Sequence, residues 1–320
     1  MPNYSKLLLF CLFLSVTLFF SCNTGGAASS SDETSALLAF KSALVDPLGA
    51  LSGWASSIPH CRWPGVGCGT AGTIRRLDLS CMNLSGTVSD DILRLPSLAY
   101  LNLSYNSFST ALPASLVALS ALEVFDVSQN NFAGEFPAGL GACAGLVTVN
   151  AFFEGPIPPS YGSFRKLKFL GLSGNNITGK IPVELGGVSS LEKLIIGYNE
   201  LEGTIPTEFG NLANLRYLDL AVGNLNGPIP PELGRLRSLT TLYLYKNNLD
   251  GAIPKEIGNA SALAYLDLSD NSIAGPIPAE LARLTNLQLL NVMCNRLKGP
   301  VRPGSGNWPG WRCWSCGTTR

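Results

Sequence analysis

The sequence predicts an α/β repeat solenoid, and two observations support this prediction. One pattern, L-x-x-L-x-L-x-x-N-x-L-x-G-x-I-P-x-x-L-x-x-L-x-x, recurs along the chain and is clearest from Leu263 to Asn286. Its period is 24 residues at every step but one, because the copies at Leu146 and Leu167 lie 21 residues apart. A fixed period of this length is typical of stacked repeats. Ten copies are present, beginning at Ile74, Leu98, Leu122, Leu146, Leu167, Leu191, Leu215, Leu239, Leu263 and Leu287.

Each repeat predicts one short strand followed by a turn that returns behind it. In the copy at Leu263, Leu266 and Leu268 alternate with polar residues, as in a strand with one buried face. No single repeat can bury its apolar side, whereas stacked neighbours bury a continuous core. We therefore expect a right-handed leucine-rich repeat horseshoe with a parallel sheet on its concave face. The apolar residues expected behind this sheet are Ile273, Ile277, Leu281 and Leu284.

In seven of the ten repeats, an asparagine at position 9 is expected to hold the turn that follows the strand, whereas Met82 and Gly223 replace it in two. The asparagine amide both donates and accepts, so stacked asparagines can satisfy the backbone groups of adjacent turns. Glycine at position 13 permits a backbone angle that the turn needs. The copy at Leu146 lacks positions 7 to 9, which predicts a tightened, locally disordered turn. The loss is either of these 3 residues or, if a whole 24-residue repeat went with them, of 27. The position-9 asparagines are Asn106, Asn130, Asn175, Asn199, Asn247, Asn271 and Asn295.

Residues 1–28 are expected to be a secretory signal peptide. Lys6 precedes the apolar run 7–20, which is shorter than the roughly 20 residues that a membrane-spanning helix needs. The alternative is an uncleaved membrane anchor. Because no second apolar run of spanning length follows, we expect no membrane span and a secreted chain as written.

Residues 29–73 are expected to form an N-terminal helical cap closed by a disulfide. Apolar residues at helical spacing follow Asp32, a candidate N-cap. Trp54 and Trp63 supply large apolar surfaces that can cover the first repeat. Cys61 and Cys68 are expected to pair, because the chain is predicted to be secreted. A metal site there would need more ligands than the single histidine of the chain provides.

Composition excludes several classes of function. The 22 basic and 22 acidic residues cancel, and neither a basic stripe for nucleic acid nor a cluster for anionic membranes is present. With one histidine, in the cap, no Ser-His-Asp set can form. We therefore expect no enzyme, no cofactor and no metal centre.

Residues 302–320 depart from the repeat, which is otherwise continuous from 74 to 301. This tail has three Trp and two Cys but no Leu. When its codons are shifted by one base, Asn307/Trp308 and Cys313/Trp314 must each give Leu, at repeat positions 22 and 4. We therefore expect that the tail is translated out of frame; the alternative is a genuine, unusual C-terminus.

The repeat ending in G-x-I-P, together with the cap segment from Cys61 to Cys68, resembles the plant-specific leucine-rich repeat class. Signal peptide, cap and repeats are together similar to the ectodomain of plant receptor-like kinases. Segments such as 168–176, 195–200 and 217–225 look closest to receptors for small secreted peptides of the CLE type. Members of that family continue into a membrane helix and a kinase, and this sequence contains no kinase motif.

The resemblance implies a receptor-like module that recognises an extracellular peptide or protein, and also a co-receptor ectodomain. It places a full-length member at the plasma membrane, facing outward. The alternative is a secreted solenoid inhibitor similar to polygalacturonase-inhibiting proteins. Those proteins carry paired cysteines in both caps, whereas this chain has one such pair, at the N-terminus.

The resemblance also places the ligand on the concave face, at strand positions 2, 3, 5, 7 and 8. Tyrosine suits such a surface because it combines an apolar ring with a polar tip. The alternative is a solvated face with scattered aromatic residues. The candidate binding residues are Phe169, Lys193, Tyr198, Arg216, Tyr217, Asp219, Tyr243, Tyr245, Lys246, Tyr265 and Asp267.

Four asparagines begin N-x-S or N-x-T sequences, which accept N-linked glycans in secreted chains. They are Asn83, Asn102, Asn176 and Asn259. Asn102 lies on a predicted concave strand, so a glycan there would obstruct the early repeats. This favours the later repeats as the binding region.

Overall fold

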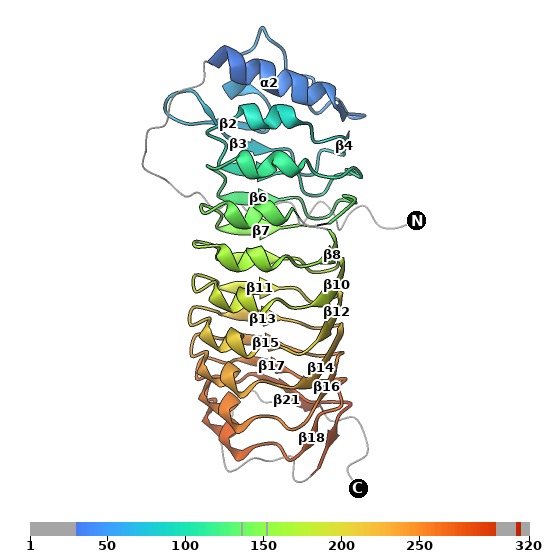
Figure 1. The fold of residues 1–320 in the computed structure, drawn as a ribbon, viewed down its shortest axis with the longest axis vertical. Coiled ribbons are helices and arrows are strands. Elements are labelled where there is room, and N and C mark those ends of the chain that lie inside the picture. The colour runs from blue at the N-terminus through green and yellow to red at the C-terminus, as the bar shows by residue number, and fades with distance from the viewer. Residues whose placement is uncertain (1–29, 136, 152, 299–311, 315–320) are drawn as a thin grey trace.

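The computed structural model describes residues 30–135, 137–151, 153–298 and 312–314, which form one curved stack of repeats (Figure 1). The predicted signal peptide and most of the predicted out-of-frame tail lie outside these residues. Within the described residues, every helix is too short or too polar to cross a membrane.

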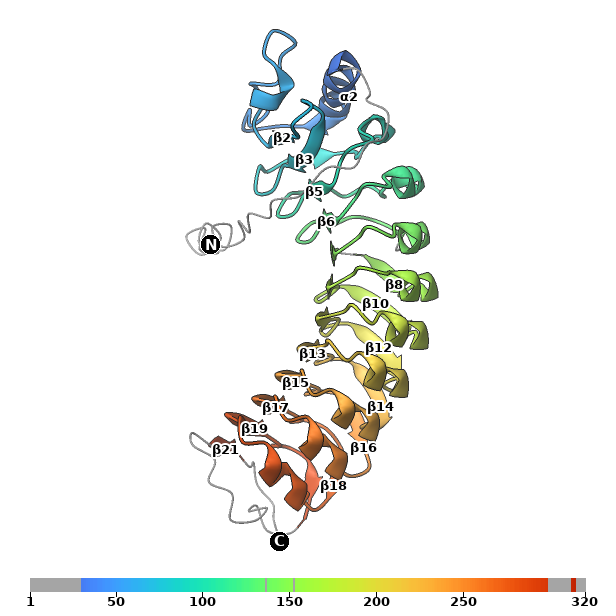
Figure 2. The same ribbon diagram turned by 90° about the vertical axis from the view of Figure 1, so that its left-hand side faces the viewer.

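A twelve-stranded sheet lines the concave side, as predicted (Figure 2). Equivalent positions pair from repeat to repeat, so Leu194, Leu218 and Leu242 lie side by side. All neighbouring strands are parallel except β2 and β3, which are antiparallel. In order, the strands are β2 Val66–Cys68, β3 Ile74–Asp78, β5 Tyr100–Asn102, β6 Val124–Asp126, β7 Thr148–Asn150, β9 Phe169–Gly171, β11 Lys193–Ile195, β13 Tyr217–Asp219, β15 Thr241–Tyr243, β17 Tyr265–Asp267, β19 Leu289–Asn291 and β21 Arg312–Trp314.

The convex side carries one five-residue 3-10 helix in each of the nine repeats from Ile74 to Leu263 (Figure 2). Most of these helices follow a proline such as Pro182 or Pro206, whose φ near −60° leads the chain from extended backbone into the helix. The proline at position 16 therefore fixes where these helices begin, whereas η2 follows Ser89 at the same position. The helices are η2 Asp90–Arg94, η3 Ala114–Ala118, η4 Ala138–Ala142, η5 Pro159–Ser163, η6 Val183–Gly187, η7 Thr207–Asn211, η8 Pro231–Arg235, η9 Lys255–Asn259 and η10 Ala279–Arg283.

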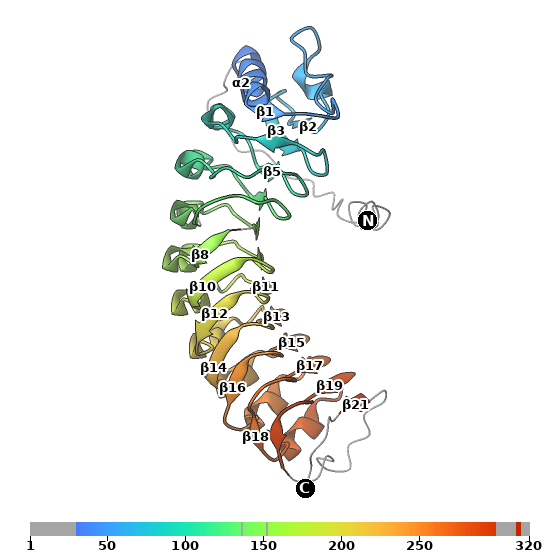
Figure 3. The same ribbon diagram turned by 90° about the vertical axis from the view of Figure 1, so that its right-hand side faces the viewer.

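A second parallel sheet, which the sequence analysis did not predict, lies between these helices and the concave strands (Figure 3). Position 12 of one repeat pairs with position 10 of the next, as in Thr178 with Glu200. Its five strands are β8 Glu154–Pro156, β10 Asn176–Lys180, β12 Glu200–Gly203, β14 Asn224–Pro228 and β16 Asn248–Asp250. Two smaller pairs join β18 Ala274–Gly275 to β20 Arg296–Leu297, and β1 Leu44–Val45 to β4 Ser85–Gly86.

The leucine ladder between the sheets and the helices is buried, which confirms the core assignment. Ile273, Leu281 and Leu284 have no exposed surface, and Ile277 is partly buried against them. In the repeat at Leu287, Leu287 and Leu290 are buried as well. Strand β21 pairs alongside β19 at this end of the sheet.

The asparagine ladder is confirmed in detail. The Asn199 amide nitrogen donates to the Leu172 carbonyl oxygen of the preceding repeat at 2.8 Å and to the Ile196 carbonyl oxygen of its own. Its amide oxygen accepts from the backbone N–H groups of Asn175 and Ile177. Each such asparagine therefore bonds two successive turns.

The repeat at Leu146 has a tightened turn, as predicted. Only residues 151–153 separate β7 from β8, yet both sheets keep their register across the gap, with Thr148 paired to Phe169 and Glu154 to Asn176. The next asparagine bridges the shortened turn, because Asn175 donates to the Ala151 carbonyl and accepts from the Phe153 N–H. This turn is therefore three residues shorter than the equivalent turn of the other repeats, since its period is 21 residues and theirs is 24.

The cap begins with α2 Ser30–Ser42, the one α-helix of the described residues. Asp32 lies inside this helix, so its assignment as the N-cap was wrong; its carboxylate instead lies in the first turn, where the helix dipole favours negative charge. Trp54 and Trp63 are buried and stacked with ring centroids 5.3 Å apart, as expected of residues that cover the first repeat.

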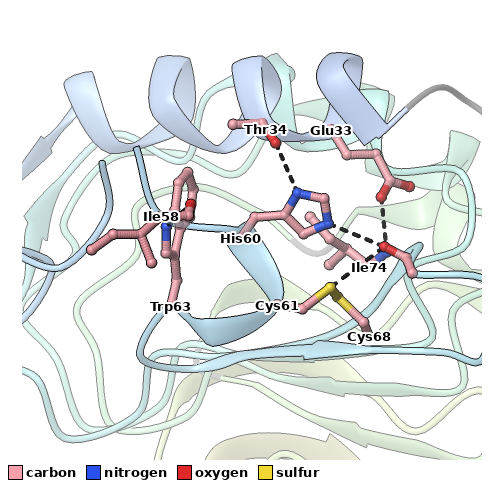
Figure 4. Close-up of a disulfide and its surroundings, with 9 residues drawn as sticks. Glu33, Thr34, Ile58, His60, Cys61, Trp63, Cys68 and Ile74 are labelled. Carbon is pink, nitrogen blue, oxygen red and sulfur yellow. Dashed lines mark hydrogen bonds between the residues drawn. A yellow bond between two sulfur atoms is a disulfide. The ribbon is translucent and has the colours of Figure 1, made fainter. Parts of the chain in front are cut away.

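The disulfide between Cys61 and Cys68 is confirmed (Figure 4). It joins the short 3-10 helix η1 His60–Arg62 to β2. Beside it, the His60 ring bonds to the Thr34 hydroxyl at 2.8 Å and to the Gly72 carbonyl at 3.1 Å. The fully buried Glu33 carboxylate accepts from the Ile74 N–H, the first amide of β3. These contacts attach α2 to the start of the sheet.

Candidate functional site

Strand register brings most of the predicted binding residues into two rows on the concave sheet. Position 3 forms one row, which includes Phe169, Lys193 and Tyr217, each paired with the next. Position 5 forms the second row, in which Asp219 pairs with Tyr243. Residues at both positions project from the same face, because side chains alternate along a strand.

Four tyrosines, Tyr198, Tyr217, Tyr243 and Tyr245, gather at the centre of this face and are called the tyrosine cluster below. The hydroxyls of Tyr198 and Tyr245 are hydrogen-bonded at 2.6 Å, although the residues are two repeats apart. Tyr243 contacts Tyr217 and Tyr245 edge to face, with centroids 5.8 Å and 6.1 Å apart. Edge-to-face packing is favourable between aromatic rings, so the cluster is a defined surface.

Small residues and an unusual backbone angle allow this arrangement. Tyr198 has a left-handed φ of 57°, which is uncommon outside glycine. The repeat between Tyr198 and Tyr245 places Ala221 at position 7, and the one before it places Gly197 there. A Cβ on Gly197 would lie 2.8 Å from an Asp219 carboxylate oxygen and 2.6 Å from the Ala221 carbonyl oxygen. Position 7 of the repeat at Leu191 must therefore be glycine, whereas position 7 of the repeat at Leu239 holds Tyr245.

Asp219 is the acidic member of the site and is 8% exposed. Its carboxylate accepts from the Ala221 N–H at 3.0 Å, the one hydrogen bond it makes to the described residues. Burial raises the pKa of this carboxyl, and the Ala221 N–H opposes that rise. Within the part of the chain that the structure describes, no lysine or arginine forms an ion pair with it.

Three hydroxyls of the cluster, those of Tyr217, Tyr243 and Tyr245, have raised pKa values. Burial, followed by the nearby Asp219 carboxylate, raises the pKa of Tyr217 to about 12. Burial and the same carboxylate raise the pKa of Tyr243. Burial and the Tyr198 hydrogen bond raise the pKa of Tyr245. These phenols stay neutral at physiological pH and act as hydrogen-bonding groups.

Basic side chains surround the cluster. Lys193, Arg216 and Lys246 are all exposed, and Lys246 shares the left-handed backbone of position 8. Their cationic ends make no ion pair with any described residue. They are therefore available to anionic or carbonyl groups of a ligand.

Three predicted residues lie apart from the cluster or are already engaged. Phe169 lies two strands away from Tyr217, with its ring across Gly171. The Tyr265 hydroxyl donates to Gln288 at 2.8 Å. Asp267 accepts from Ser269 and, at 2.9 Å, from the Asn291 amide, so its carboxylate has structural partners.

The four sequon asparagines occupy different surfaces. Asn83, Asn176 and Asn259 are exposed, away from the concave sheet. Asn102 lies on β5, where its amide donates to the Tyr100 hydroxyl and accepts from the Ser104 N–H. Glycosylation at all four remains a prediction.

Every member of the tyrosine cluster was predicted from the sequence as a concave-face residue, but the contacts between the tyrosines were not. Tyr198 and Tyr245 lie at positions 8 and 7 of repeats that are two apart, and their contact depends on the left-handed φ of Tyr198. No pattern of residues in the sequence predicts this backbone angle. The small number of hydrogen bonds to Asp219, in contrast, can be predicted from the sequence. Asp78, Asp126 and Asp267 are each followed two residues later by Ser, whereas Asp219 is followed by Ala.

Family models match both parts of the fold. Residues 30–69 match the leucine rich repeat N-terminal domain, and residues 73–132, 165–225 and 233–297 match the leucine rich repeat. Together these segments cover more than half of the chain.

Similar proteins are plant receptors. MDIS1-interacting receptor like kinase 1 of Arabidopsis thaliana is 47% identical over 79 residues, which are 24% of this chain and 8% of that relative. The brassinosteroid receptor kinase BRL3 of Oryza sativa subsp. japonica is 51% identical over 87 residues, 25% of this chain and 7% of that relative. The chain thus matches less than a tenth of these relatives.

Solved structures extend the likeness over most of the chain. The HAESA ectodomain of Arabidopsis, in complex with an IDA peptide hormone ligand that is extended at its N-terminus, has a TM-score of 0.81 at 34% identity, covering 90% of this chain and 50% of that one. The GASSHO1/SCHENGEN3 ectodomain of Arabidopsis thaliana, in complex with CASPARIAN STRIP INTEGRITY FACTOR 2, has a TM-score of 0.78 at 36% identity, covering 83% and 33%. The chain therefore belongs to the leucine-rich repeat family, with the cap and repeats of plant receptor kinase ectodomains.

Proposed function

We propose that this chain is an extracellular, receptor-like recognition module that binds an extended peptide along the concave face of the repeats from Leu167 to Leu263. The observation that carries the proposal is the tyrosine cluster flanked by the exposed cations Lys193, Arg216 and Lys246. Aromatic residues and arginine dominate binding energy at protein interfaces. The face is long and continuous, which suits an extended ligand.

The similar structures support the class of ligand and of partner. HAESA is described in complex with a peptide hormone and the co-receptor SERK1. By analogy, we propose that a co-receptor ectodomain is a second partner of this chain. No step of this function requires chemistry at the site, so recognition rather than catalysis is the proposed activity.

Selection from a displayed library of random dodecapeptides tests the proposal. The whole chain should enrich peptides whose binding falls about thirtyfold when Tyr217 or Tyr245 is replaced by alanine, the loss expected of a hot-spot residue. Lys255→Ala is the matched control, because Lys255 is exposed on the convex helix η9. It should leave the affinity unchanged.

Two results would contradict the proposal. One is that no peptide is enriched over a parallel selection carried out without the chain. The other is that the enriched peptides bind equally to the Tyr217→Ala, Tyr245→Ala and parent chains, which would place the binding surface elsewhere.

A further inference from the structure

Asp219 differs from the other position-5 aspartates in its partners. Asp126 and Asp267 each accept from a serine two residues later and from the asparagine at position 5 of the next repeat. At Asp219 the serine is replaced by Ala221, and the asparagine by Tyr243. Both partners that satisfy the carboxylate elsewhere on this face are thus absent at one site.

Without these two partners, the Asp219 carboxylate is a largely buried acidic group with few hydrogen bonds on the concave face. A buried carboxylate is unfavourable unless it is paired or hydrogen-bonded. Asp219 is 8% exposed, and among the described residues its one bond is to the Ala221 N–H. Tyr243 pairs with Asp219 on the next strand, and Tyr217 lies two residues before Asp219 on the same face. The faces of such aromatic rings attract cations.

The first repeat of the chain shows a related arrangement, in which a cation lies between a position-5 aspartate and a tyrosine ring. In the first repeat, the Arg76 guanidinium forms an ion pair with Asp78, which also occupies position 5. The same guanidinium lies over the Tyr100 ring, 3.6 Å from its centroid. An aspartate at position 5 and a neighbouring tyrosine therefore hold a guanidinium on this sheet. At Asp219 the residue equivalent to Arg76 is Tyr217, so the chain supplies no cation there. The residue equivalent to Tyr100 is Thr241, so the aromatic rings beside Asp219 come instead from Tyr217 and Tyr243.

We propose that Asp219 and the tyrosine cluster bind a cationic side chain of the ligand, with arginine preferred over lysine. This assignment rests on the proposed peptide-binding function and specifies one residue class of the peptide. A guanidinium fits because its planar face stacks on tyrosine while its N–H groups reach the carboxylate. A metal ion fits less well, since a single carboxylate supplies too few oxygen ligands.

The test uses two small probes that differ in charge. Nα-acetylarginine amide carries the guanidinium, and Nα-acetylcitrulline amide is its neutral isostere. Each is titrated into the whole chain with ¹³C-labelled tyrosine rings, and the ring resonances are followed by NMR. The arginine probe should give saturable shifts, with affinity at least fivefold higher than that of the citrulline probe.

Three variants test whether the arginine probe binds at Asp219. Asp219→Asn should reduce affinity for the arginine probe at least fivefold. The double change Ala221→Ser and Tyr243→Asn recreates the partners of Asp126 and Asp267, so it should reduce affinity while keeping the charge. Asp267→Asn is the matched control, because that carboxylate is already bonded, and it should change affinity less than twofold.

Equal binding of the two probes would overturn the inference, as would failure of both to bind or an unchanged affinity in Asp219→Asn. None of these results affects the library selection, which detects peptides of any composition through Tyr217 and Tyr245. If the arginine probe binds but no peptide is selected, the cation site stands and its assignment to a peptide ligand is lost.

Discussion

One side chain in each turn determines how strongly neighbouring repeats are joined. The Asn199 amide makes three donor contacts and two acceptor contacts with backbone groups of two turns. All of these groups are shielded from water, so each would be costly without a partner. The ladder residues thus contribute far more than an average polar residue.

Replacing Asn199 by alanine should therefore lower the free energy of unfolding by about 3 kcal/mol, since several buried N–H and C=O groups lose their partners. Urea denaturation followed by circular dichroism measures the change. The exposed Asn248, also in a repeat turn region, provides the control. Asn248→Ala should cost less than about 0.5 kcal/mol, and equal losses in the two variants would contradict the ladder's role.

Glu33 provides a second test at the scale of one residue. Burial raises the pKa of this carboxyl, against the lowering effects of the Ile74 N–H and of His60. The folded cap therefore favours the protonated form, and its contribution to stability is largest at low pH and is lost as pH rises through the folded pKa. Lowering the pH from 7 towards the ordinary value of Glu should stabilise the cap.

Glu33→Gln keeps an acceptor for the Ile74 N–H but cannot ionise. Unfolding free energies measured from pH 4.5 to 7.5 should consequently vary less with pH in this variant than in the parent chain. Glu202→Gln, on the exposed surface of β12, should leave the parent profile intact. A Glu33→Gln profile that parallels the parent would show that Glu33 does not titrate between these limits.

At the scale of elements, the shortened turn between β7 and β8 interrupts the asparagine ladder but leaves the side-chain contacts on the concave sheet in place. Among the described residues, the repeats at Leu122 and Leu146 are not joined by a position-9 asparagine, because Leu146 lacks that position. The Asn150 side chain instead bonds to Asp126 and Ser128 on the concave sheet. The turn side of this junction is therefore weaker than its neighbours.

Inserting Ser-Gln-Asn after Ala151 should restore the missing positions and supply the absent ladder residue. We expect the free energy of unfolding to rise by about 1 to 3 kcal/mol, the value of satisfying buried backbone groups. Ser-Gln-Ala is the matched insertion without the amide. If both insertions stabilise the chain equally, loop length rather than the ladder explains the gain.

Elements also show what periodicity can predict and what it cannot. The buried leucines and the asparagine ladder were predicted because each depends on one position repeated at fixed spacing. The second sheet was not, because residues 176–180 have neither alternation nor high strand propensity, and they pair only when stacking brings turns together. The cap helix was predicted, but its start was misplaced because the apolar spacing marks a buried face rather than a helix end.

For the molecule as a whole, stability is a sum of contacts between neighbours. Damage at one end should therefore stay local. Replacing Cys61 and Cys68 by serine removes a disulfide that closes a short loop, which should cost about 2 to 3 kcal/mol. Hydrogen exchange should increase in the cap and in β3, while β13 and β15 keep their protection. Uniform loss of protection would show that the stack unfolds as one unit.

The hydrogen bond between Tyr198 and Tyr245 spans two repeats, and this span can be compared with the length of an extended peptide bound on the concave face. Parallel strands are spaced about 4.8 Å apart, whereas an extended peptide advances about 3.3 Å per residue. A peptide running along the solenoid axis therefore passes two repeats, the span of the tyrosine bond, in about three residues. Successive side chains of an extended peptide point to opposite sides, so a side chain three residues further on faces away from the sheet. A side chain that both faces the sheet and lies over the equivalent position of a repeat recurs only after about six residues and four repeats. Adding one residue to such a peptide would place every following side chain out of phase with the rows beneath it, so that length as well as composition would be selected.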